Sequence, residues 1–178
     1  MKKKKNSSFV VIALLLIVTI SIGYAALSTT SNINGTSTIK TQTWDVHFAN
    51  VKVTTNTGAT VTKAPTITEG KTTEVTYNVA LNKPGSVYEF TVDVVNGGSI
   101  AAKTSAAPTL GGNTQTGIFN YTVTWSDGSA ITANTTLAAG ATKTAKVRVE
   151  YKKDITVSQL PTADTALTLT CSIPYVQA

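Results

Sequence analysis

Apolar and polar residues alternate at every second position along most of the chain after residue 44. A period of two places successive side chains on opposite faces of a β-strand, so each alternating run predicts a strand with one buried face. No run after residue 27 has the 3.6-residue apolar stripe of a helix. The clearest alternating runs are Trp44 to Phe48, Val75–Leu81, Tyr88–Val94, Phe119–Trp125, Ala145–Tyr151 and Leu167–Ile173.

Irregularities between these runs also fit a β-fold. The segment Asn82 to Gly85 holds proline and glycine at the positions that a tight turn favours. The apolar phase slips at Ala49–Asn50, which predicts a β-bulge. The sequence therefore predicts an all-β fold: one antiparallel β-sandwich (jelly roll) of about seven to nine strands over residues 44–178. Residues 105–117 and 127–140 are expected to be loops.

The N-terminus differs from everything that follows. Lysines occupy positions 2 to 5, Phe9–Ile22 contains no charge, and small residues come next, ending in Ala25 and Ala26. This order predicts a helical export signal over residues 1–26, cleaved after Ala25 or Ala26 so that the mature chain begins near Leu27. The alternative is a retained membrane anchor, because the apolar run extended to Leu27 approaches the ~20 residues that span a bilayer.

Residues 27–43 form a third region, polar and rich in threonine and serine. The large apolar residues in it are Leu27, Ile33 and Ile39, whose odd numbers would place them on one face of an extended strand. The segment could be a strand of its own sandwich, a flexible stalk, or a strand that pairs with another subunit. Asn34-Gly35 could also fold it into a tight hairpin.

Composition excludes several classes of partner and site. The net charge of +6 falls to +2 without Lys2 to Lys5, since 11 basic residues then face 9 acidic ones, and the remaining lysines do not cluster as phosphate binding requires. We therefore expect no nucleic-acid partner, and membrane contact only through the signal segment. The single cysteine, Cys171, lies on the apolar phase of its run and is expected to be a buried core thiol, with no disulfide within the chain.

Catalytic and metal-binding patterns are also missing, so we expect no catalytic residue, no cofactor and no metal ligand. His47 is the single histidine, which leaves no pair of histidine ligands. The pair Asp45 and His47 is interpreted as hydrogen-bonded at a strand rim, in preference to a catalytic or metal site. Glu69 and Glu74 flank a turn without a catalytic pattern. Aromatic residues on the apolar phase are expected in the core: Trp44, Tyr77, Tyr88, Phe90, Tyr121 and Trp125.

Two stretches resemble a known family. Gly23 to Ser28 followed by Asn32 to Thr36 is similar to the signals processed by the SipW-type signal peptidase of Gram-positive bacteria. Leu81 to Gly85, followed by Phe90 to Gly98 and Lys103, resembles a stretch of the TasA and camelysin family of biofilm-matrix and surface proteins. The tail from Leu167 through Gln177 also fits small exported proteins with this signal.

The resemblance implies a jelly-roll subunit that is secreted or held at the surface of a Gram-positive cell. It also implies assembly by donor-strand exchange, in which residues 27–43 insert beside strands of a neighbouring subunit, with Leu27, Ile33 and Ile39 as the apolar face. The expected partners are then copies of the chain itself, other matrix or surface proteins, and the signal peptidase. The metallopeptidase activity attributed to camelysin does not carry over, because the chain has no recognisable zinc site.

Two other functions remain open from the sequence. The first is a surface-displayed, adhesin-like domain that binds glycan or protein through residues 105–117 and 127–140, with Asn113 and Gln115 as contact residues. The second is an enzyme with Asp45 and His47 in its site. The leading prediction is a structural, non-enzymatic subunit of a surface or matrix fibre.

Overall fold

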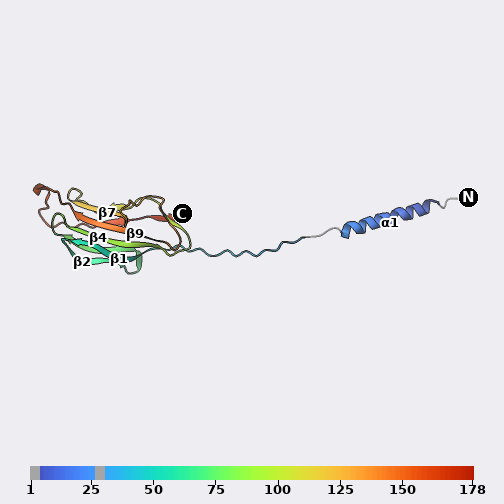
Figure 1. Cartoon of the computed structure of the whole chain (residues 1–178), viewed down its shortest axis with the longest axis horizontal. Helices are drawn as coiled ribbons and strands as arrows, with labels where there is room; N and C mark the ends of the chain where they lie inside the picture. Colours follow the sequence, from blue (N-terminus) through green and yellow to red (C-terminus); the bar gives the residue numbers. More distant parts are fainter. Residues whose placement is uncertain (1–4, 27–30) are drawn as a thin grey trace. The chain divides into compact units, whose positions relative to one another are not determined.

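The computed structural model describes residues 5–26 and 31–178 of the chain (Figure 1). It consists of two units, Met1–Lys40 and Thr41–Ala178. The first unit contains the helix α1 (Lys5–Ala26), which includes the predicted apolar run, and residues 31–40, which form neither helix nor strand. The second unit is the β-domain, and its first residue precedes the predicted boundary at residue 44.

The β-domain is antiparallel throughout, which confirms the all-β prediction. A four-stranded sheet has the order β1-β4-β9-β7, and these labels follow one another across the domain in Figure 1. Its strands are β1 (Val46–Thr57), β4 (Val87–Asn96), β7 (Phe119–Trp125) and β9 (Thr142–Tyr151). The remaining strands are β2 (Ala59–Thr68), β3 (Lys71–Leu81), β5 (Ala102–Thr104), β6 (Thr109–Gly111), β8 (Thr136–Leu137), β10 (Thr170–Ser172) and β11 (Tyr175–Gln177).

One face of the four-stranded sheet is the core and the other is polar. Burial alternates along all of β4, so that its even-numbered residues are buried and its odd-numbered residues are partly exposed. On the polar face, Arg148 pairs with Glu89 at 3.4 Å, and the Thr144 hydroxyl donates to the Asp93 carboxylate at 2.6 Å. The alternation read from the sequence therefore gives the correct inner and outer faces.

Three small sheets lie against the inner face, namely β2-β3, β10-β6 and β11-β5-β8. Under the first, Tyr88 and Phe90 form a buried cluster with Val147 and Val149, and apolar side chains of β2 and β3 pack against it. A second cluster joins residues of β4, β7 and β9 to Ala102, Ile131 and Leu137. The covering of the inner face, called the second layer below, is thus divided among three small sheets, whereas the four-stranded sheet is continuous.

Two local predictions are confirmed. The register of β1 against β4 shifts between Ala49 and Lys52, and Asn50 adopts a positive φ of 49° there, so the bulge is present. The turn at Asn82–Gly85 is present as well, with Gly85 at φ 84° and the Ser86 N–H donating to the Lys83 carbonyl at 3.0 Å. This turn joins β3 to β4 and therefore carries the chain from one layer to the other.

Several boundaries differ from the prediction. The edge strand β2 was not predicted, because Pro65 interrupts its pattern, and its register shifts between Lys63 and Thr66. Both expected loops contain short strands, β6 and β8. The closing run Leu167–Ile173 forms a strand only at Thr170–Ser172, since its sole partner β6 is equally short.

Two predictions of burial are wrong, and both concern residues at the division in the second layer. Trp44 precedes β1 and is 48% exposed, whereas Tyr88, Phe90 and Trp125 are buried as expected. Cys171 is an exposed residue of β10 and not a core thiol. An apolar phase within a strand predicts burial only where a second layer covers that strand.

Candidate functional site

A groove of about 320 Å³ opens at the division in the second layer. Val94 of β4 and Thr73 of β3 are among its lining residues. The other lining residues come from the start of β1 and from the chain around β10 and β11: Trp44, Val46, His47, Phe48, Cys171, Ser172, Ile173 and Tyr175. The groove therefore brings together segments that are about 20 to 130 residues apart in sequence.

The strands beside this groove have unused edges. Within the described residues, β3 pairs only with β2, β10 only with β6, and β11 only with β5. No residue of β2, β5 or β6 lines the groove. β3, β10 and β11 each contribute lining residues, and each has one edge that no described strand pairs with. Such edges present unpaired N–H and C=O groups.

The lining combines apolar and polar groups, and polar groups contribute at least as much of its surface as apolar ones. Val46, Phe48 and Ile173 supply aliphatic and aromatic surface, and the Tyr175 hydroxyl is buried without a hydrogen-bond partner among the described residues. Burial raises the pKa of Tyr175 to about 12. A buried hydroxyl without a partner costs about 1–3 kcal/mol, and the backbone of an additional strand could supply that partner.

His47 and Asp45 form the predicted hydrogen-bonded pair, with 2.8 Å between Nδ1 and Oδ1. His47 lines the groove, and its side chain is 29% exposed. Within residues 5–26 and 31–178, no three histidine, cysteine or carboxylate side chains are grouped so that they could hold a metal ion. The pair is placed to orient the imidazole at the groove wall.

Cys171 is the one residue with nucleophilic chemistry in the groove. Although the residue is exposed, desolvation raises the pKa of its thiol to about 11. The thiol is therefore almost entirely protonated at neutral pH, whereas a nucleophilic cysteine has a lowered pKa. The geometry makes Cys171 part of an apolar wall and a useful chemical probe of the groove.

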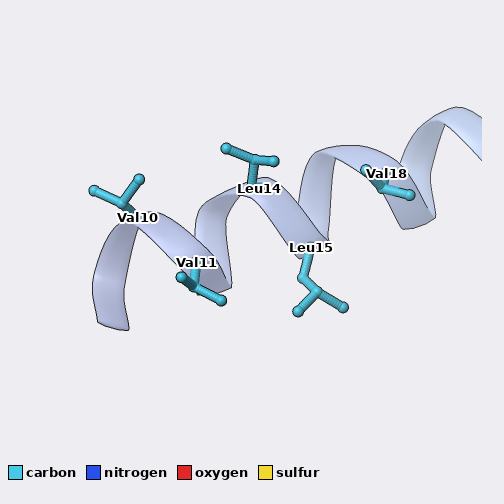
Figure 2. Close-up of a pocket in the computed structure, with 5 residues that line it drawn as sticks. All are labelled: Val10, Val11, Leu14, Leu15 and Val18. Carbon is cyan, nitrogen blue, oxygen red and sulfur yellow. The ribbon is translucent and has the colours of Figure 1, made fainter. Parts of the chain in front are cut away.

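A second hollow lies on α1 and is bounded by side chains of that helix alone. Figure 2 shows Val10, Val11, Leu14, Leu15 and Val18 projecting from successive turns. The hollow contains no convergent polar groups, so it has no features of a binding site. No helix in the described part of the chain combines the length and apolar character that crossing a membrane requires.

The N-terminal site residues have the following positions. Ala25 and Ala26 are the last residues of α1, and Leu27 lies outside the described residues. Ile33 and Ile39 are 99% and 95% exposed. Residues 31–45 form no strand, and no hairpin is present at Asn34-Gly35, so this segment is not a strand of its own domain.

The other candidate residues have local structural roles. The Lys71 ammonium donates to Glu74 at 3.0 Å and, with the Thr68 hydroxyl, lowers the pKa of that carboxyl. The Asn113 amide donates to the Phe119 carbonyl at 3.1 Å, while the Gln115 N–H donates to the Asn113 side chain. Asn113 thus holds its own loop together.

The groove itself was not predicted. The position of the groove depends on where the second layer divides. That division is determined by which strands pair with one another, and periodicity does not show it. The available clue was Trp44, a large aromatic residue that begins its run directly after the polar segment 27–43. Comparison of the chain with protein-family models, curated proteins and solved structures finds no match.

Proposed function

We propose that the chain is an exported structural subunit that polymerises by strand addition. In this assembly, the N-terminal segment 27–43 of one copy enters the groove of the next copy. The observation that carries the proposal is a groove lined by residues of β3, β10 and β11, each of which has an edge without a described partner. The same chain has an extended segment with almost fully exposed isoleucines.

The segment offers apolar side chains that the apolar part of the groove can bury. Ile33 and Ile39 share one face of an extended chain and lie about 20 Å apart at ~3.3 Å per residue. Fully burying an isoleucine side chain contributes roughly 1.5–3 kcal/mol. The polar residues between them suit a strand whose other face stays in water. The backbone of the segment can bond to β3 on one side and to β10–β11 on the other, as in β-strand addition.

The symmetry of this contact leads to a fibre. The donor segment and the acceptor groove are different surfaces, so the contact is head-to-tail. After each addition, the assembly still has a free groove at one end and a free segment at the other. An interface of this kind generates an open filament unless its rotation closes a ring.

The proposal also covers the family of the chain and its location in the cell. We propose a jelly-roll subunit of the TasA and camelysin type, made with a signal peptide for the SipW-type peptidase and incorporated into the matrix or surface of a Gram-positive cell. The two antiparallel layers, the lysine-rich start before α1 and the turn at Asn82–Gly85 support it. Release of the mature chain near Leu27 would free the segment that assembly needs.

The test begins with the mature chain from Leu27, followed by sedimentation and negative-stain microscopy over days. We expect filaments or a ladder of oligomers, and a folded monomer once residues 27–43 are deleted. Polymers that persist after the deletion would refute strand addition. A wild-type chain that remains a monomer at all concentrations and salt conditions would refute the structural role.

A further inference from the structure

The loop between β4 and β5 grips the base of the N-terminal segment. The Gly97 N–H donates to the Asp45 carbonyl at 2.8 Å, and the Ser99 N–H donates to the Thr43 carbonyl at 3.0 Å. In return, the Thr43 N–H donates to the Ser99 hydroxyl at 2.8 Å, and that hydroxyl donates to the Gln42 side-chain oxygen at 3.0 Å. Both backbone groups of Thr43 are therefore bound to Ser99.

Two glycines make this close approach possible. A β-carbon at Gly98 would lie 2.5 Å from the Thr43 carbonyl oxygen and 2.8 Å from the Asp45 nitrogen. A β-carbon at Gly97 would lie 2.5 Å from the Asp45 carboxylate. The contact at Gly98 is with backbone, which cannot rotate aside, so any side chain there would displace the segment.

Asn96 holds the loop between β4 and β5 in the conformation that binds the N-terminal segment. Its side chain is fully buried, and its amide donates to the carbonyls of Ile100 at 2.9 Å and Leu137 at 3.0 Å. Its side-chain oxygen accepts from the Gly98 N–H at 3.2 Å. The hydrogen bonds of this buried amide hold the loop in one conformation. The loop therefore does not have to become ordered when it binds the segment.

We propose that residues 96–99 form a clamp that directs the N-terminal segment to a second copy of the chain and away from its own groove. The inference rests on the proposed function. Trp44, directly after Thr43, lines the groove. A reversal at residues 41–43, directly beside the groove, would break the bonds at both backbone groups of Thr43. Insertion into a second copy leaves them intact.

The clamp is tested by Gly98→Ala in the mature chain, with Gly117→Ala as the matched control, because nothing lies within 4 Å of a β-carbon at Gly117. Ser99→Ala is a second variant that removes the hydroxyl bonds without adding volume. In dilute monomers we measure amide hydrogen exchange at Thr43 and Ser99 and the alkylation rate of Cys171. Polymerisation rates follow at higher concentration.

We expect exchange at Thr43 to accelerate about tenfold or more in Gly98→Ala and Ser99→Ala, as befits the loss of one or two hydrogen bonds. Alkylation of Cys171 in the monomer should slow because the released segment can cover the groove, and polymerisation should slow correspondingly. Gly117→Ala should match wild type in all three measurements.

The alternative outcomes separate the clamp from the proposed function. A synthetic peptide of residues 27–43 is added to chains that lack this segment. If that peptide fails to bind the wild-type groove, strand addition is refuted and the clamp with it. If the peptide binds, but both clamp variants polymerise like Gly117→Ala, the clamp alone is refuted.

Discussion

The inner face of the four-stranded sheet is covered in two different ways. Over Tyr88 and Phe90, the β2-β3 pair covers the sheet, and these residues are 1% and 2% exposed. At the groove, Trp44 is 48% exposed and Cys171 is an exposed residue. The same alternating pattern built both regions. The difference shows that the chain completes its core at one place and leaves strand edges unpaired at the other.

Truncation at the closed region should have the largest effect. Phe90→Ala removes a buried ring that packs edge-on against Tyr77 with 5.0 Å between ring centroids. We expect a loss of about 3–5 kcal/mol in the free energy of unfolding, measured by urea denaturation of the monomer. Trp44→Ala at the groove should cost less than about 1 kcal/mol in the same experiment. Equal losses would show that the two regions do not differ as described.

Substitution in the segment should leave the monomer intact and weaken assembly. Ile39→Asp changes a residue that is 95% exposed, so the free energy of unfolding should stay within about 0.5 kcal/mol of wild type. The dissociation constant of the polymer contact should rise about tenfold to a hundredfold, because an isoleucine is no longer buried. The matched control is Val157→Asp, which alters an 85% exposed residue of the domain outside the groove. Equal weakening by both would contradict the account.

Alkaline pH should destabilise the domain through tyrosines in both regions. Burial raises the pKa of Tyr77 and of Tyr175 to about 12, from 10.0. Below pH 10 both phenols are neutral in the folded and the unfolded chain, so their contribution to stability is fully present. Between pH 10 and 12 the unfolded chain loses these protons first, and stability falls. Urea midpoints across this range should fall less steeply in Tyr77→Phe and Tyr175→Phe; unchanged slopes would contradict the burial of the hydroxyls.

The last prediction concerns the reactivity of the thiol in the groove and involves no change in stability. Because the pKa of Cys171 is about 11, alkylation of the monomer should rise about tenfold per pH unit from pH 7 to pH 10 without levelling near 8.5. In the polymer, an inserted strand should cover the thiol and slow the reaction at every pH. A rate that levels near pH 8.5 would mean that the thiol lies in water, and equal rates in monomer and polymer would mean that the groove stays empty.

Periodicity predicted the parts of the fold that depend on local pattern. The strict burial along Val87–Asn96 follows from alternation alone, and the bulge at Asn50 follows from a phase slip. Periodicity failed where burial depends on which strands pack against one another. Cys171 has the same alternating context as Val147, but it lines the groove, so Cys171 is exposed and Val147 is buried.

The candidate site was only half predictable. Ile33 and Ile39 could be selected because their spacing places them on one face of an otherwise polar segment. The groove could not be selected, since its walls come from residues near 44–48, 73 and 171–175, which only the tertiary fold brings together. The gripping of Thr43 by Ser99 depends on the same long-range arrangement.

The central claim, insertion of the segment into the groove of another copy, can be tested with one covalent bond. Donor chains carry Ile33→Cys or Ile39→Cys together with Cys171→Ser, so that a disulfide with wild-type chains can form only through Cys171 of the acceptor. The Cα atoms of two cysteines must come within about 7 Å for that bond. A donor with Val157→Cys and Cys171→Ser is the control. The account predicts rapid covalent dimers for at least one segment variant and slow ones for the control. Equal rates for all three donors would contradict it.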